Sequence, residues 1–395
     1  MDEYKNFDIE VSENPFDYFL KTKHGFPEKA KKYLEDYIQQ TKKYKNLYKT
    51  FKQLRFSLYQ PALNTNAGKR YLYFRLLRKF LYIKAPAVVT IGITKKCQCY
   101  CEHCSAEYHM NSKERDLSTE EFINSIKESI ELGVTNIIFV GGEPLLNKNL
   151  EKIIKTIPPN LAISTLFTNG EFLTKERAKS LKDFGLQGIF VSLDSYKEEE
   201  HNSLRKRNIF SKALQGIENA RREGIPIAIS SYLTKERVQK EFIEQFMELG
   251  KNLEISEITF FDAIPTGRMG SSKNSFLDLE ARKKILELTI LYRKLKEYPI
   301  LTPQSVMTSE CGHGFCFAAT TQFYLSSTGY VCPCDFTPLT VGKYPNHSIK
   351  ELWNRLITSV PYSKRSKVCR MQNPEFRRKY IETIPPSSPL PHLLD

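Results

Sequence analysis

Short apolar runs alternate with helical patterns through the middle of the chain. The first run, residues 88–93, is almost continuously apolar, which is typical of a strand buried on both faces of a parallel sheet. Five similar segments follow, at 136–140, 162–167, 188–192, 227–231 and 257–261, with helical patterns between them at 173–184, 211–223 and 239–249. A capping box, Ser-Thr-Glu-Glu from Ser118, begins another helix. Six strands with intervening helices predict a parallel α/β domain, either doubly wound or an open barrel.

The segments on either side of this core have different patterns. Residues 30–38 carry Tyr and Leu at helical spacing, and residues 69–84 alternate aromatic, aliphatic and basic residues before Pro86. A helix over 69–84 would bring four apolar side chains onto one face, namely Leu72, Leu76, Phe80 and Ile83. We therefore predict four regions: a helical N-terminal extension at 1–86, the α/β core at 87–300, a small cysteine-rich module at 301–372 and an extended, poorly ordered tail at 373–395.

Positive charge is concentrated in one part of the chain. The whole sequence has 59 Lys and Arg against 45 Asp and Glu, and fourteen of the basic residues lie between residues 37 and 96, where no acidic residue occurs. The rest of the chain is electrically balanced, which argues against a generally basic, histone-like protein. The basic stretch has three interpretations: a helix packed beside the core with a solvated edge, a site for an anionic peptide or lipid, or a peripheral membrane surface.

Composition narrows the class of protein further. Hydrophobic residues make up 41% and charged residues 26%, which is ordinary for a globular chain and argues against disorder. No apolar run is long enough for a membrane helix, and the acidic start lacks the apolar core of a signal peptide. These features predict a cytoplasmic location, where nine cysteines favour metal or redox sites over disulfides.

Three cysteines follow the first predicted strand at close spacing. Cys97, Cys101 and Cys104 form a Cys-x3-Cys-x2-Cys pattern. Four-iron clusters are normally held by four thiolates, so three ligands would leave one iron open to a substrate or cofactor. A structural zinc site would need four ligands in two paired halves. Zinc binding and free thiols are the alternatives, and the intervening Cys99 fits neither a paired zinc site nor the cluster spacing.

A glycine-rich motif ends the second predicted strand. Gly141-Gly142-Glu143-Pro144 combines two glycines, which allow a ligand close to the backbone, with a carboxylate that can hold an ammonium group. Taken alone, the motif is also typical of a tight turn. With the three cysteines one strand earlier, it resembles the radical S-adenosylmethionine (radical SAM) enzymes over about residues 88–264.

This resemblance implies a partial (β/α)6 barrel with a 4Fe-4S cluster at the C-terminal ends of its strands. In that family the open iron binds S-adenosylmethionine, and one electron cleaves it to methionine and a 5′-deoxyadenosyl radical that abstracts a substrate hydrogen. It also implies an electron donor such as flavodoxin or ferredoxin. The residues that match the family's positions are Cys97, Cys101 and Cys104 for the cluster, Gly141, Gly142 and Glu143 for the methionine amine, Ser192 for the ribose, Arg205 for the methionine carboxylate and His103 near the adenine. A surface salt bridge is the alternative for Arg205.

The C-terminal cysteines resemble the start of the SPASM/Twitch extension of the same superfamily. Cys316, Gly329 and Cys334 have its spacing, and a hairpin at 329–331 and a helix from Ser348 follow its order. The resemblance implies one auxiliary 4Fe-4S cluster on Cys311, Cys316, Cys334 and Cys369, with Cys332 able to replace one of them. Only Cys369 follows Trp353, so a second auxiliary cluster lacks ligands. A zinc site on the same thiolates is the alternative.

The substrate is predicted less directly than the cofactors. A closed auxiliary cluster favours electron transfer, which would make the reaction a net oxidation. By resemblance to the SPASM/Twitch group, we expect a peptide or protein substrate. A lipid or small metabolite at a membrane surface is the second interpretation, with residues 37–96 as the contact, and a non-catalytic iron–sulfur or zinc interaction protein is the third. Nucleic acid is not expected, because no nucleic-acid-binding motif accompanies the basic residues.

Overall fold

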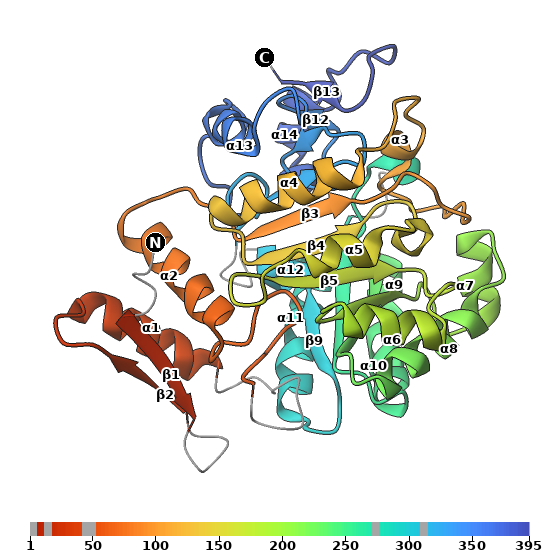
Figure 1. The fold of residues 1–395 in the computed structure, drawn as a ribbon. Coiled ribbons are helices and arrows are strands. Elements are labelled where there is room, and N and C mark those ends of the chain that lie inside the picture. Colours follow the sequence, from red (N-terminus) through yellow and green to blue (C-terminus); the bar gives the residue numbers. More distant parts are fainter. Residues whose placement is uncertain (1–5, 12–17, 42–52, 271–275, 309–314, 395) are drawn as a thin grey trace.

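The fold is built on one nine-stranded sheet (Figure 1). The computed structural model describes residues 6–11, 18–41, 53–270, 276–308 and 315–394. The strand order is β11-β10-β3-β4-β5-β6-β7-β8-β9, and every neighbouring pair is parallel except β10 and β11. The strands are β3 (Val88–Gly92), β4 (Asn136–Val140), β5 (Ile163–Thr168), β6 (Ile189–Ser192), β7 (Ile227–Leu233), β8 (Glu257–Asp262), β9 (Ile300–Pro303), β10 (Gln322–Leu325) and β11 (Val331–Cys332). The α/β fold with a parallel sheet is therefore confirmed.

Helices cover the outer face of the sheet, as the alternating pattern predicts (Figure 1). They are α4 (Thr119–Glu131), α5 (Leu150–Lys155), α6 (Lys175–Asp183), α7 (Glu198–Arg205), α8 (Phe210–Arg222), α9 (Lys235–Gln239), α10 (Phe242–Asn252) and α11 (Leu279–Lys294). The predicted capping box is present: the Ser118 hydroxyl accepts a hydrogen bond from the Glu121 N–H, and the Glu121 carboxylate accepts one from the Ser118 N–H. None of the described helices is both long and apolar enough to cross a membrane.

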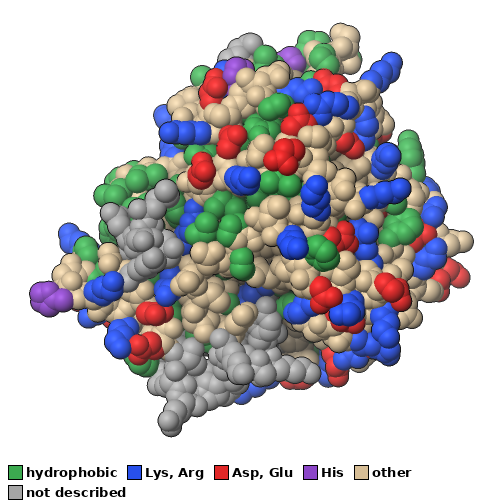
Figure 2. Space-filling view, viewed as in Figure 1, with side chains coloured by type: hydrophobic (Ala, Val, Ile, Leu, Met, Phe, Trp, Pro, Cys, Tyr) green, Lys and Arg blue, Asp and Glu red, His purple; other side chains and the backbone are tan. Residues whose placement is uncertain are grey.

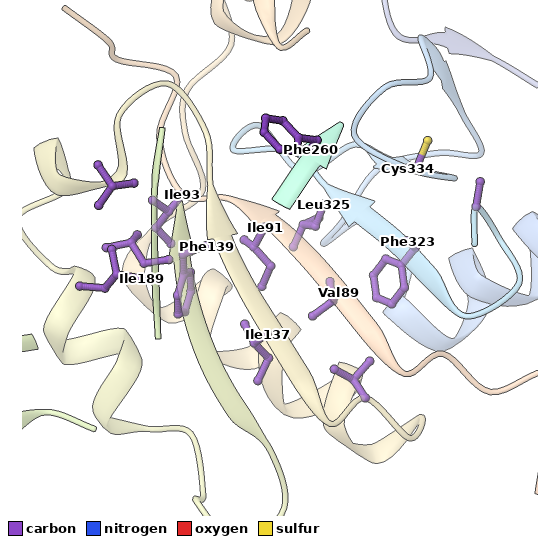
Figure 3. Close-up of a cluster of buried hydrophobic side chains, with 14 of the residues drawn as sticks. Val89, Ile91, Ile93, Ile137, Phe139, Ile189, Phe260, Phe323, Leu325 and Cys334 are labelled. Carbon is purple, nitrogen blue, oxygen red and sulfur yellow. The ribbon is translucent and has the colours of Figure 1, made fainter. Parts of the chain in front are cut away.

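Side chains alternate between two sides of the sheet. On β3, Val89 and Ile91 point into the main hydrophobic core, and Ile137 and Phe139 of β4 join them there (Figure 3). Their neighbours along the strands, such as Thr90, face the opposite side and line a cavity. All eight parallel strands contribute residues to that cavity. The sheet therefore wraps around it as an incomplete barrel, which is the arrangement that the resemblance implies.

The N-terminal extension is not wholly helical, which corrects the prediction. Helices α1 (Glu28–Thr41) and α2 (Asn66–Phe80) are present, but β1 (Phe7–Val11) and β2 (Tyr18–Thr22) form an antiparallel pair. Phe7 and Ile9 are buried while Asp8 between them is exposed, so the period of two that identifies a strand was present in the sequence.

The end of α2 also differs from the prediction. Leu72 and Leu76 are buried as expected, but the helix ends at Phe80, and Ile83 lies beyond it. Phe80 is 38% exposed and Ile83 is 44% exposed. The predicted apolar face is therefore buried over its first half only, and its second half, Phe80 and Ile83, is exposed to solvent.

The C-terminal part continues the core sheet. Strand β10 pairs with β3, and α12 (Gln304–Thr308) follows β9, while β12 (Leu339–Thr340) and α13 (Ile349–Thr358) lie farther along. The predicted disordered tail is wrong, because α14 (Pro374–Tyr380) is helical and β13 (His392–Leu393) pairs with β12. The His392 N–H donates to the Pro338 carbonyl at 2.8 Å. This long-range pairing orders a proline-rich segment that has no local pattern of its own.

Two arginines among the described residues of the basic stretch have a structural role. Arg55 is 1% exposed and donates to the backbone carbonyls of Gln60 in the extension and Gln187 in the core, at 2.9 and 2.5 Å. The Arg70 guanidinium donates to the Val134 carbonyl at 2.6 Å. These long side chains join the extension to the core by satisfying carbonyls at element ends, so the packing interpretation holds for them.

Candidate functional site

A cavity of about 680 Å³ occupies the interior of the incomplete barrel. Its volume is within the ordinary range for sites that enclose a small ligand. The predicted site residues that line it are Cys97, Cys101, His103, Cys104, Gly141, Gly142, Glu143, Ser192, Arg205, Cys316, Cys334 and Cys369. The remaining predicted ligand, Cys311, lies outside the described residues. The fold thus brings the two groups of cysteines, more than 200 residues apart in sequence, to one enclosed space.

The loop that carries the first cysteines is held from two sides. On one side, the N–H groups of Tyr100 and Glu102 donate to the last carbonyls of α7, those of Arg205 and Leu204, at 3.2 and 3.0 Å. On the other side lies the short helix η3 (Gly267–Met269). There the Arg268 guanidinium donates to the Cys101 carbonyl at 2.9 Å, and the Arg268 N–H donates to the Cys104 carbonyl at 3.1 Å. A fixed loop can present several thiols to one ligand with little loss of conformational entropy.

Gly267 explains how η3 approaches this loop so closely. Its φ is +54°, and a Cβ atom at this position would lie 2.1 Å from the Cys104 carbonyl oxygen. Sequence analysis did not identify Gly267 or Arg268, because their partner is more than 160 residues away. In the sequence, the one feature that could have pointed to them is a Gly-Arg pair in a loop after a predicted strand.

The thiols of this loop differ in their electrostatics. A hydrogen bond from Cys99 lowers the pKa of the Cys101 thiol, and the nearby Arg205 charge lowers it further. Burial raises the pKa of the Cys104 thiol to about 11. Cys99 is 5% exposed, and its sulfur lies 3.7 Å from the Asn169 amide nitrogen. Three spaced thiols on one fixed loop, facing a cavity, fit a four-iron cluster with one open iron.

Glu143 lies beside this loop at the end of β4. Its carboxylate is 1% exposed and accepts hydrogen bonds from the Leu145 N–H at 3.0 Å, the Thr168 hydroxyl at 2.7 Å and the Asn169 N–H at 2.8 Å. Burial raises the pKa of the Glu143 carboxyl, and these hydrogen bonds oppose that shift. The carboxylate therefore joins the ends of β4 and β5, and Glu143 also lines the cavity.

The preceding glycines are required by close backbone packing. A Cβ atom on Gly142 would lie 2.2 Å from the Lys96 carbonyl oxygen, and one on Gly141 would lie 2.4 Å from the Thr94 carbonyl oxygen. The Glu143 N–H donates to the Lys96 carbonyl at 2.7 Å. The glycines thus allow the motif to pack directly against the segment that leads to Cys97.

Asp194 connects two of the predicted ligand-binding residues and was not assigned a role from the sequence. Its carboxylate accepts a hydrogen bond from Arg205 Nε at 2.6 Å, and its other oxygen lies 3.3 Å from His103 Nε2. Burial alone would raise the pKa of Asp194, but the charges of Arg205 and His103 hold it well below its usual range. His103 also stacks on Tyr232, with ring centroids 4.5 Å apart. The pair with Asp194 is buried, so the surface-salt-bridge interpretation of Arg205 does not hold.

Ser192 lies at the end of β6, next to this pair. Its hydroxyl accepts a hydrogen bond from the Ser230 hydroxyl of β7 at 3.2 Å. Both hydroxyls line the cavity. Hydroxyls at neighbouring strand ends can bind the oxygen atoms of a sugar.

The second group of cysteines lies at the other side of the cavity. Cys316, Cys334 and Cys369 line it, whereas Cys332 is completely buried in β11 and does not. A hydrogen bond from the Cys369 thiol lowers the pKa of the Cys316 thiol, and burial raises the pKa of Cys334 to about 12. In the parts of the chain that the structure describes, no three His, Cys, Asp or Glu side chains are spaced as around a single metal ion. Cys332 is therefore set apart from the other three by its place outside the cavity lining.

Two further features of the cavity were not found from the sequence. The carboxyl of Asp335, next to Cys334, lines the cavity, and burial raises its pKa to about 6. At the end of the cavity near the extension, Arg75, Arg78 and Arg365 contribute to the lining. Burial lowers the pKa of the Arg78 guanidinium to about 10. Lys79 and Arg365 line the cavity at this end and are exposed, so the cavity opens to solvent there. We call this end the mouth of the cavity; it is cationic, whereas the interior has sulfur and carboxylate groups.

Comparison with known proteins identifies two family matches. Residues 91–249 match the model of the radical SAM superfamily, and residues 316–371 match that of SPASM, an iron–sulfur cluster-binding domain. Between them, these two ranges contain all the described cysteines that line the cavity.

Curated relatives match between 59% and 69% of this chain. Fe-coproporphyrin III synthase of Methanosarcina barkeri is 31% identical over 232 residues, which are 59% of this chain and 57% of that protein. AdoMet-dependent heme synthase of Oleidesulfovibrio alaskensis is 26% identical over 300 residues, 69% of this chain and 75% of that protein. GTP 3',8-cyclase of Helicobacter pylori is 28% identical over 263 residues, 62% of this chain and 79% of that protein.

Solved structures match the fold over 68% to 88% of the chain. Streptococcus suis SuiB bound to its precursor peptide SuiA has a TM-score of 0.58 at 15% identity, and the match covers 88% of this chain and 87% of that chain. The enzyme anSMEcpe with bound AdoMet and a peptide has a TM-score of 0.52 at 21% identity, with 68% of this chain and 80% of that chain covered. At these identities, the likeness extends to the fold alone.

Proposed function

Because this chain belongs to the radical SAM superfamily and carries a SPASM-type cluster-binding domain, we propose that it catalyses a net oxidation of a substrate held between two iron–sulfur clusters. The observation that carries this proposal is the single cavity lined by both groups of cysteines. A substrate in that space would lie within reach of a radical generated on one side and an electron acceptor on the other.

On the first side, Cys97, Cys101 and Cys104 would hold a 4Fe-4S cluster with one open iron. Such a cluster supplies the electron that cleaves S-adenosylmethionine into methionine and a 5′-deoxyadenosyl radical, which then takes a hydrogen atom from the substrate. Helix α7 and η3 fix the position of the thiols through the hydrogen bonds to Tyr100, Glu102, Cys101 and Cys104.

The surrounding residues would bind and orient S-adenosylmethionine. Glu143 and the backbone at Gly141 and Gly142 would accept hydrogen bonds from the methionine amine, and Ser192 from the ribose. Arg205 lines the cavity with its charge held beside Asp194, so it would bind the methionine carboxylate from a fixed position. His103, stacked on Tyr232, would present a flat face to the adenine.

On the second side, Cys316, Cys334 and Cys369, with Cys311, would hold the auxiliary cluster. Hydrogen abstraction leaves one unpaired electron on the substrate. A cluster held by these residues would supply an acceptor for that electron, and loss of the electron together with one proton would form a new bond within the substrate, a two-electron oxidation in total. Four thiolates would close this cluster to direct substrate binding, which favours the electron-transfer role.

A peptide or protein is the first candidate substrate. It is supported by the fold likeness to SuiB in complex with its precursor peptide, which extends over 88% of this chain. The second candidate is a small anionic metabolite. It is supported by the curated relatives, whose names refer to Fe-coproporphyrin III, heme and GTP.

Anaerobic reconstitution followed by reduction with dithionite tests the core of this proposal. We expect about eight irons per chain, from two four-iron clusters, and release of 5′-deoxyadenosine from S-adenosylmethionine. Replacing Cys97, Cys101 and Cys104 with Ala should leave about four irons and abolish the cleavage. Replacing Cys332 with Ala is the matched control, because this cysteine is buried but does not line the cavity.

Two outcomes would contradict the proposal. One is cleavage that persists in the triple Cys→Ala variant, and the other is zinc instead of iron after anaerobic purification.

A separate experiment distinguishes the substrate candidates: incubation with a synthetic peptide library, GTP or Fe-coproporphyrin III. A net oxidation requires S-adenosylmethionine to be consumed in a one-to-one ratio with product, so regeneration of S-adenosylmethionine would argue against it.

A further inference from the structure

The connection between α2 and β3 exposes a run of apolar side chains. Leu81 is 63% exposed, Tyr82 is 83% exposed, and Phe80 and Ile83 on either side are also exposed. Figure 2 shows hydrophobic side chains gathered over this connection. Four consecutive exposed apolar residues are costly in water, so the surface needs an explanation beyond folding.

A second segment, far away in sequence, lies against this connection. The Lys84 amine donates to the carbonyls of Ile357 and Ser363, both at 3.0 Å, and Trp353 Nε1 donates to the Lys84 carbonyl at 2.7 Å. The turn held by these bonds carries Val360, which is 75% exposed. The apolar surface therefore consists of two segments that are fixed to each other, residues 79–84 and 357–367, here called the docking surface.

Basic residues surround these apolar side chains. Five of them belong to the docking surface: Lys79, Lys84, Lys364, Arg365 and Lys367, all of which are exposed. Neither segment contains an Asp or Glu. The rest of the chain has 54 Lys and Arg against 45 Asp and Glu, and Figure 2 shows acidic and basic side chains interspersed over the rest of this face. Local positive charge next to exposed Leu and Tyr is the combination that binds the interface of an anionic bilayer.

The docking surface is also continuous with the mouth of the cavity. Lys79 and Arg365 belong to both, and Arg78, the residue before Lys79, lines the cavity as well. A flat partner seated on this surface would therefore cover the mouth. Tyr82 is suited to such a position, since tyrosine combines an apolar ring with a hydroxyl that stays in the headgroup region.

We infer that the protein docks peripherally on membranes rich in anionic lipids through residues 79–84 and 357–367, with the cavity mouth facing the bilayer. The inference does not depend on the proposed oxidation, because it rests on exposure and charge alone. It does specify where substrate must arrive: from the membrane surface or from the layer of solution next to it.

Sedimentation of the reconstituted full-length protein with lipid vesicles tests the inference. Wild type should bind vesicles of phosphatidylcholine mixed with phosphatidylglycerol and should not bind vesicles of phosphatidylcholine alone. Each Lys or Arg near an anionic surface contributes about fivefold to binding, so Lys364→Gln with Lys367→Gln should weaken it about 25-fold. Leu81→Ser with Tyr82→Ser should weaken it by roughly tenfold or more. Added salt should weaken wild-type binding as well.

The control variants change the same properties elsewhere on the surface. Lys175→Gln with Lys179→Gln removes the same charge from α6, and Leu279→Ser removes a leucine that is 62% exposed, close to the 63% of Leu81. Both controls should bind like wild type, and all variants should still cleave S-adenosylmethionine. The inference is overturned if wild type does not bind anionic vesicles, or binds neutral vesicles equally well. It is also overturned if the control substitutions weaken vesicle binding as much as the substitutions in the docking surface. Loss of cleavage in every protein with binding intact would instead refute the proposed function alone.

Discussion

The buried pair of Asp194 and Arg205 gives the sharpest prediction about the site. Asp194 is 2% exposed and Arg205 is 7% exposed, and Arg205 Nε lies 2.6 Å from Asp194 Oδ2. Asp194→Asn keeps the shape of the side chain but removes the negative charge. The Arg205 guanidinium would then be buried without a counter-charge, while the amide oxygen could still accept one hydrogen bond.

The expected loss in the free energy of unfolding is about 3 kcal/mol. Removing one partner of a buried pair costs about 3–5 kcal/mol, and the retained hydrogen bond favours the lower end of that range. Urea unfolding at neutral pH measures the loss. The control is Asp183→Asn, which breaks an exposed pair with Lys179 whose side chains are 56% and 63% exposed, and it should cost less than about 0.5 kcal/mol.

The difference in the free energy of unfolding between wild type and Asp194→Asn should depend on pH with a definite sign. The pKa of Asp194 is depressed in the folded state, so its contribution to stability is present above the unfolded value of about 4 and is lost as the pH falls below it. The difference between wild type and Asp194→Asn should therefore shrink below pH 4. A loss under about 1 kcal/mol at neutral pH, or one as small as in Asp183→Asn, would refute the role given to this pair.

Three further predictions concern the cluster loops and a buried histidine. Gly267→Ala should lower the iron content from about eight to about four, because the new Cβ displaces the Cys104 carbonyl. The control is Gly224→Ala, because Gly224 also has a positive φ of +69° but no atom lies within 4 Å of the new Cβ. This control should keep all the iron. Equal iron in the two variants would contradict the role given to Gly267. Cys311→Ala should likewise remove about four irons, and full retention would exclude Cys311 as a ligand. Burial lowers the pKa of His109 to about 3, so the contribution of His109 to stability should fall by about 2 kcal/mol between pH 7.5 and pH 5. His109→Phe should remove that part of the pH dependence and leave the part due to His201, whose pKa burial also lowers; an unchanged pH dependence in the variant would contradict this.

The sequence by itself determined the elements of the core and the chemistry of the site. The six predicted strands occur within two residues of their predicted ends, since strands buried on both faces must be apolar whatever their neighbours are. The cysteine spacing and the Gly-Gly-Glu-Pro motif were also readable, because each is a local arrangement of fewer than ten residues. The helical patterns of the core were also readable, because their periodicity is local. The helices α6, α8 and α10 begin and end within three residues of the predicted positions.

Other features depended on contacts between distant segments. The carboxylate of Asp194 acquires its role only when α7 brings Arg205 to one of its oxygens and the cysteine loop brings His103 to the other. Gly267 and Arg268 act on a loop more than 160 residues earlier, and the proline-rich tail is ordered by pairing with β12. None of these partners can be found from local periodicity.

The basic stretch shows the division most clearly. Its sequence established a strong local excess of positive charge but left three interpretations open. The tertiary structure shows that different basic residues have different roles. Arg55 and Arg70 donate to backbone carbonyls, whereas Lys79 lies at the cavity mouth, two and three residues before the exposed Leu81 and Tyr82. The physical reason is that a charge has the same sign wherever it lies, but its role depends on whether the fold places it against a carbonyl, a cavity or open solvent.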